Sequence, residues 1–151
     1  MPESRVTTQQ KNLVAERARD CCEYCRSHAR FALQPFSVEH IIPHSQGGTT
    51  TLDNLALACQ GCNNHKYNKT AAPDQIGGEG VALYHPRQQR WSDHFAWNAD
   101  FTLIIGLTPV GRATVEALHL NRAGLVNLRR VLYVVGEHPP LEPEGRHSSS
   151  T

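Results

Sequence analysis

The stretch Phe36–Pro43, FSVEHIIP, decides the fold of this 151-residue chain. Its β-branched and aromatic residues predict a strand over 36–42, which Pro43 ends. Within it an acid, Glu39, stands directly before a histidine, His40. Neighbours on a regular strand point to opposite faces, so both side chains reach one site only at a bulge or where the strand ends. The pair is the one expected of a metal ligand beside a general base.

Two Cys-x-x-Cys pairs flank this stretch, Cys22/Cys25 (the first knuckle) and Cys59/Cys62 (the second knuckle). Four thiolates presented by two turns are the ligands of a structural zinc ion. The 33 residues between the pairs exceed the spacing of a compact zinc ribbon, so a subdomain must fold within the loop that the zinc ion closes. A redox-active pair or disulfides are the alternatives, but neither requires two pairs around one histidine-containing strand. Cys21 is the spare cysteine, because only Cys22 has the correct distance to Cys25.

Composition limits the class of protein. A net charge of +1 is far from the strongly basic signature of a dedicated nucleic-acid binder. The sequence shows no leader-like start and no apolar segment of membrane-spanning length. We therefore expect a cytoplasmic protein with no membrane partner, in a reducing compartment where thiols bind metal more often than they form disulfides.

The elements around the decisive stretch follow from local patterns. A capping box at Thr7 predicts a helix over 8–19. Residues 44–51 form a loop whose two glycines permit a tight reversal. A second short strand over 55–58 enters the second knuckle, and a short helix follows over 63–69. The predicted order is strand, loop, strand, helix.

Two asparagines complete the pattern. Asn54 lies across the glycine loop from the strand, and its amide can tie the loop to the strand. Asn63 stands first on the short helix and offers an oxygen ligand close to a zinc-held turn.

Five motifs in this segment resemble those of the HNH endonucleases, which have a ββα-metal core. They are Cys-Glu-Tyr-Cys (22–25), Val-Glu-His-Ile-Ile-Pro (38–43), Ser-Gln-Gly-Gly (45–48), Leu-Asp-Asn-Leu (52–55) and Cys-Gln-Gly-Cys-Asn-Asn-His-Lys (59–66). The resemblance covers about Cys22 to Lys69, under half of the chain. Because several spaced motifs agree at once, it is specific.

The resemblance implies roles for five residues. His40 is the implied general base, and Asn54 is the residue that braces the catalytic loop. Glu39 and Asn63 would hold a catalytic divalent ion, and Lys66 stands where the family often carries a basic residue, as a phosphate contact. Asn63 stands where the last letter of the family name, HNH, calls for a histidine. Its side-chain oxygen favours Mg²⁺ or Mn²⁺ over zinc. Glu39 stands where aspartate is commoner.

The chain divides into a nuclease core with zinc knuckles over 1–72, an extension packed on the core over 73–138, and a disordered tail over 139–151. In the extension we expect a linker or surface loop over 74–80, strands over 81–84 and 101–105, and a helix from Thr108-Pro109. A final amphipathic helix over about 122–135 has one apolar face, which consists of Leu125, Leu128, Val131, Leu132 and Val135.

Residues 84–97 interleave aromatic and basic side chains, as nucleic-acid surfaces do. We favour packing onto the core for Trp91, Phe95 and Trp97. Arg87 and Arg90 stay open as nucleic-acid phosphate contacts.

Together these features predict an α+β fold: a ββα-metal (HNH/His-Me finger) core stapled by structural zinc, with a C-terminal α/β extension. The expected function is a metal-dependent endonuclease that hydrolyses phosphodiester bonds in DNA, with a double-stranded DNA partner. The alternative is a non-catalytic zinc-ribbon module that binds nucleic acid.

Overall fold

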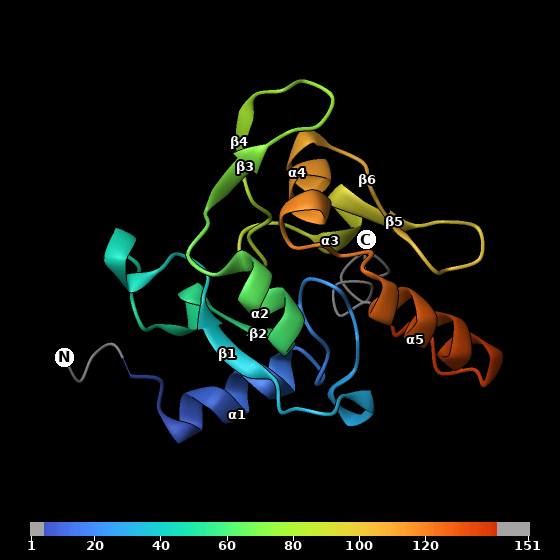
Figure 1. Cartoon of the computed structure of the whole chain (residues 1–151). Helices are drawn as coiled ribbons and strands as arrows, with labels where there is room; N and C mark the ends of the chain where they lie inside the picture. The colour runs from blue at the N-terminus through green and yellow to red at the C-terminus, as the bar shows by residue number, and fades with distance from the viewer. Residues whose placement is uncertain (1–4, 142–151) are drawn as a thin grey trace, which may run out of the picture.

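Three two-stranded antiparallel sheets and five α-helices make up residues 5–141, the part of the chain that this computed structural model describes (Figure 1). In chain order the helices and strands are α1 (Thr8–Arg17), β1 (Ser37–His40), β2 (Leu55–Ala58), α2 (Gln60–Lys66), β3 (Ala71–Pro73), β4 (Gly80–Ala82), α3 (Trp91–His94), β5 (Phe95–Trp97), β6 (Ile104–Gly106), α4 (Pro109–Ala117) and α5 (Ala123–Val134). Within this range, no helix has the length and apolar character needed to cross a membrane.

The predicted strand, loop, strand, helix order is confirmed. β1 pairs antiparallel with β2, with Glu39 opposite Ala56 and His40 opposite Leu55, and α2 begins directly after β2. β1 is shorter than predicted and ends at His40. The next residue, Ile41, donates its backbone N–H to the Asn54 carbonyl at 2.8 Å, just before the chain turns into the loop.

The glycine loop packs tightly on the end of β1. Gly47 adopts a φ of 91°, a left-handed conformation that glycine reaches without a steric penalty. A Cβ atom at Gly48 would lie 1.7 Å from the Ile42 carbonyl oxygen and 2.8 Å from the Asn54 side-chain nitrogen. Only glycine therefore fits at residue 48.

α1 and α2 pack on opposite faces of the β1–β2 hairpin, as Figure 1 shows. The predicted capping box is present, because the Thr7 hydroxyl accepts the Gln10 N–H at 3.1 Å and the Gln10 side chain accepts the Thr7 N–H at 3.0 Å. α1 presents Val14 to the same apolar cluster that Val38 contacts. Glu39, the next residue on β1, faces α2 instead.

The extension shares its hydrophobic core with the ββα unit. Trp91 and Phe95 are 2% and 1% exposed, and the Trp91 indole N–H donates to the Tyr24 carbonyl at 3.0 Å, inside the first knuckle. Trp97 is partly buried against the same core. The packing that the sequence predicts for these three aromatic residues is confirmed.

Of the two alternatives for residues 74–80, the surface loop is the one found: residues 74–79 form the turn between β3 and β4, which pair as a hairpin, and Gly80 begins β4. The predicted apolar face of α5 needs correction. On α5, Val131 and Val135 are 61% and 63% exposed, whereas Arg129 is buried. The Arg129 guanidinium donates to the backbone carbonyls of Thr102 and Leu120, so a charged side chain is buried where hydropathy predicts an apolar one. The predicted disorder of the tail concerns residues 139–151, of which 142–151 lie outside the described residues.

Candidate active site and cysteine cluster

The four knuckle cysteines converge on one point. Their sulfur atoms lie within 4.8 Å of one another, and all four side chains are buried. In each knuckle the backbone N–H of the second cysteine points at the sulfur of the first, at 3.5 Å for Cys25 to Cys22 and 3.4 Å for Cys62 to Cys59. The spare residue, Cys21, lies outside this group. The cluster therefore has the donor set and the arrangement of a tetrahedral structural zinc site.

Glu39 is held in a buried polar cluster. One carboxylate oxygen accepts the Lys66 ammonium at 3.0 Å, and the other accepts the Tyr24 hydroxyl. Lys66 also donates to the Ile41 carbonyl at 2.9 Å. Burial raises the pKa of Glu39 above its ordinary range, against the opposing effects of Lys66 and Tyr24. Burial also raises the pKa of Tyr24 well above its ordinary value, and the Glu39 charge adds to the effect.

This cluster does not fit a divalent ion on Glu39. A hard cation needs carboxylate oxygens with free lone pairs and room for several ligands. Here the ammonium of Lys66 already occupies the carboxylate as a fixed cation, and Glu39 is only 8% exposed. Within the described residues, the four cysteines are the only group of three or more His, Cys, Asp or Glu placed to hold a metal ion.

Asn63 lies on the first turn of α2 and is partly buried. Residues three apart on a helix share a face, so Asn63 stands on the Lys66 side, toward β1. Its side chain makes no hydrogen bond among the described residues, and its backbone N–H donates to the Cys59 carbonyl at 2.9 Å. The amide is therefore available as a ligand, but the structure gives it no carboxylate partner.

His40 is the last residue of β1 and is partly exposed. Its Nε2 atom lies 2.8 Å from the Thr50 hydroxyl, and its Nδ1 atom has no hydrogen-bond partner in the described part of the chain. Burial lowers the pKa of His40, and the neighbouring charges of His44 and Lys66 lower it further. The imidazole is thus held by one nitrogen and carries the neutral, proton-accepting form at neutral pH.

Asn54 joins the two ends of the glycine loop. Its side-chain oxygen accepts the Ile42 N–H at 2.9 Å, and its nitrogen donates to the carbonyls of Ile42 at 3.0 Å and Thr49 at 2.8 Å. The side chain is buried, so these three bonds are shielded from water. Thr50, the partner of His40, directly follows Thr49. The amide thereby positions the loop that holds the imidazole.

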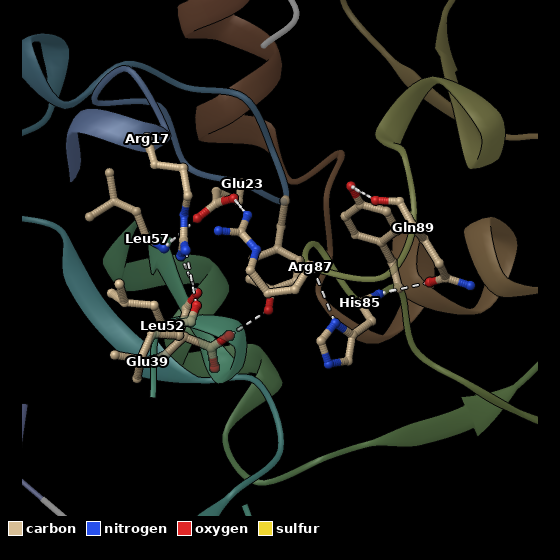
Figure 2. A network of polar contacts seen from close by, with 11 residues as sticks. Arg17, Glu23, Glu39, Leu52, Leu57, His85, Arg87 and Gln89 are labelled. Atoms are coloured by element: carbon tan, nitrogen blue, oxygen red, sulfur yellow. Dashed lines mark hydrogen bonds and ion pairs between the residues drawn. The ribbon is translucent and has the colours of Figure 1, made fainter. Parts of the chain in front are cut away.

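The three predicted phosphate contacts, Lys66, Arg87 and Arg90, lie in different environments. Lys66 is 1% exposed and paired with Glu39, which gives an external phosphate no access to it. Arg87 forms an ion pair with Glu23, a buried residue of the first knuckle whose other oxygen accepts the Leu57 N–H at 2.9 Å. Figure 2 shows the Arg87 guanidinium lying against Glu23, next to the Arg17 side chain. Of the three, Arg90 alone is exposed.

Several residues of the site escaped sequence reasoning. Tyr24 and Glu23 lie between the cysteines of the first knuckle, where the sequence gives no sign of which way they point. Thr50 is one of three consecutive threonines, and no periodic pattern selects it. Arg122 contacts the second knuckle from 60 residues away in sequence. Contacts over such distances arise from the tertiary fold, and no local signal predicts them.

Comparison with protein families matches the segment that contains this site. A family model described as HNH endonuclease matches residues 22–69, which run from the first knuckle through β1, the glycine loop and β2 to just beyond α2. No curated protein and no solved structure matched the chain. The matched segment contains the four clustered cysteines and the histidine at the end of β1. Residues 22–69 of this chain therefore form an HNH-type domain with a four-cysteine cluster.

Proposed function

We propose that this protein is an endonuclease that hydrolyses phosphodiester bonds in DNA, with His40 as the general base. The observation that carries the proposal is the state of His40 within an HNH domain. Its imidazole is held through Nε2 by Thr50, leaves Nδ1 without a protein partner among the described residues, and has a lowered pKa.

The chemistry follows from these contacts. When Nε2 donates its hydrogen to the Thr50 hydroxyl, the lone pair of the neutral ring lies on Nδ1. Nδ1 then takes a proton from a water molecule, and the hydroxide attacks the phosphorus atom in line with the departing oxygen. The bond from phosphorus to that oxygen breaks, and the oxygen takes a proton from solvent. Asn54 contributes as a positioning residue, because it fixes the loop on which Thr50 lies.

A catalytic Mg²⁺ or Mn²⁺ would absorb negative charge on the reacting phosphate. The sequence places this ion on Glu39 and Asn63, but in this structure Lys66 occupies Glu39. The steps above therefore use only the protein's own groups. Dependence of cleavage on the ion is tested by assaying zinc-loaded protein in metal-free buffer, with and without added Mg²⁺ or Mn²⁺.

Duplex DNA is the proposed partner. We propose Arg90, which is exposed, as a phosphate contact on the extension. A net charge of +1 implies few phosphate contacts and hence weak binding with a shallow dependence on salt.

A second candidate, a zinc module that binds nucleic acid without cleaving it, is favoured by one observation. The Lys66 ammonium occupies the Glu39 carboxylate that a catalytic ion would need as a ligand. Such a protein would bind DNA with equal affinity whether or not His40 is present, and neither form would cut it.

Nicking of supercoiled plasmid separates the two functions. If His40 activates water, His40→Ala should keep its zinc and its DNA affinity but cut about 10²–10⁴-fold more slowly. His28→Ala is the matched control, because His28 contacts Arg30 and Phe31 of the first knuckle region instead. Cleavage at the parental rate by His40→Ala, or no cleavage by the parent with any ion, would exclude the proposed mechanism.

A further inference from the structure

Arg122 of the extension reaches into the second knuckle. It is the residue before α5, and its guanidinium Nη2 lies 3.3 Å from the Cys59 sulfur while Nη1 lies 3.7 Å from the Cys62 sulfur. Nη1 also donates to the carbonyls of His119 at 3.1 Å and Leu118 at 3.3 Å. The guanidinium is therefore fixed by backbone groups of the extension while it faces two thiolates of the core.

A second observation on the same contact concerns Gly61, which lies between those two cysteines. A Cβ atom at this position would lie 2.3 Å from the Arg122 Nη2 and 2.7 Å from its Cζ. No side chain other than hydrogen leaves room for the guanidinium there. The second knuckle is thus shaped around Arg122 as well as around a metal ion.

The positive charge of the Arg122 guanidinium complements the negative charge of a zinc-thiolate site. Four thiolates around Zn²⁺ carry a net charge of −2 in a buried site, which is costly without a nearby cation. Groups that donate hydrogen bonds to metal ligands orient them and tune the affinity of the site. Cys59 is 8% exposed while the other three knuckle cysteines are at most 1% exposed, so it is the least shielded of the four.

We propose that Arg122 is an outer-sphere ligand of the zinc centre: its guanidinium donates to the Cys59 and Cys62 thiolates, covers Cys59 and retains the metal ion. Through Arg122, the extension then helps to retain zinc in the nuclease core. This inference rests on zinc occupancy of the four cysteines and is independent of whether the protein cuts DNA.

The test follows zinc in the full-length protein. After elemental analysis confirms one zinc per chain in the parent, release is timed with a chromogenic chelator. Arg122→Ala should release zinc about 10–100-fold faster. Arg122→Lys keeps the charge without the planar fork and should lie between. Arg130→Ala, which removes an exposed α5 arginine whose guanidinium donates to the Asn127 side chain, should match the parent.

Gly61→Ala tests the same contact with Arg122 present, because the new methyl group displaces the guanidinium. It should also release zinc faster than the parent. In Co²⁺-substituted protein, loss of the hydrogen bonds should shift the thiolate-to-metal charge-transfer band to lower energy in Arg122→Ala, a signal that reports on the thiolates themselves.

Three results would overturn the proposal. They are parental release by Arg122→Ala, parental release by Gly61→Ala alongside fast release by Arg122→Ala, and a parent that binds no zinc. Should Arg122→Ala fail to fold, Arg122→Lys and Gly61→Ala decide alone. The plasmid assay of His40→Ala is a separate measurement, so either proposal can fail without the other.

Discussion

The Lys66 ammonium lies 3.0 Å from a carboxylate oxygen of Glu39, and the two side chains are buried together between α2 and β1. Glu39 directly precedes His40 on β1, but side chains alternate along a strand, so the two point to opposite faces of the hairpin. The acid thereby joins the helix to the strand, while the histidine faces Thr50 of the glycine loop. The ion pair supports the site from the side opposite to the imidazole.

Removal of one partner of this pair should destabilise the protein strongly. Lys66→Met leaves Glu39 buried with its charge unpaired, and we expect a loss of about 3–5 kcal/mol in the free energy of unfolding. Glu39→Gln combined with Lys66→Met should cost less than the sum of the single changes, because no charge is left alone. Denaturant unfolding of zinc-loaded protein measures these values. Lys69→Met, which removes an exposed lysine, is the control. An equal loss of stability in Lys66→Met and Lys69→Met would contradict a structural role for the pair.

The pH dependence of cleavage should reveal the environment of His40. Burial, His44 and Lys66 lower its pKa below the ordinary value of 6.5. Only the neutral ring accepts a proton, so the rate should rise with pH and reach its midpoint below 6.5. His44→Ala removes one of the two neighbouring charges and should move the midpoint toward 6.5. A midpoint at or above 6.5 in the parent would show that the imidazole is not the group that titrates.

Asn54→Ala should loosen the glycine loop. The change removes three buried hydrogen bonds and leaves the Ile42 N–H and two carbonyls without their partner. We expect a loss of about 1–3 kcal/mol in stability, and a fall in the cleavage rate of the molecules that stay folded. Asn64→Ala, an exposed position on α2, serves as the control for both measurements. Full activity per folded molecule would show that the loop does not position the imidazole.

Zinc content should distinguish Cys21 from the four knuckle cysteines. Cys21 lies outside the four-sulfur cluster, so Cys21→Ser should keep one zinc per chain. Cys25→Ser removes a ligand and should lose both the zinc and most of the folded structure, since binding in small zinc modules contributes on the order of 10 kcal/mol. Elemental analysis and circular dichroism measure the two effects. Loss of zinc from Cys21→Ser would mean that the ligand set is assigned incorrectly.

Local patterns predicted the elements that depend on local physics. The capping box at Thr7, the cap and proline at Thr108-Pro109, and the glycine loop all have short-range causes, and each is found where expected. The α5 face was predicted incorrectly at Val131 and Val135, because periodicity gives no weight to a buried Arg129 that bonds to carbonyls elsewhere in the chain. β3 and β4 were missed as a hairpin because each strand spans only three residues.

By itself, the sequence determined the zinc donor set, the order of the ββα core and the identity of the histidine and asparagine on either side of the glycine loop. These depend on spacing and on residue chemistry, which a linear string records. Only the tertiary structure decided that Lys66 is a buried partner of Glu39 and not a phosphate contact, that Arg87 pairs with Glu23, and that Arg122 faces the thiolates. A charged side chain has the same letter on the surface and in the core, and what it does depends on the groups that folding brings within about 4 Å of it.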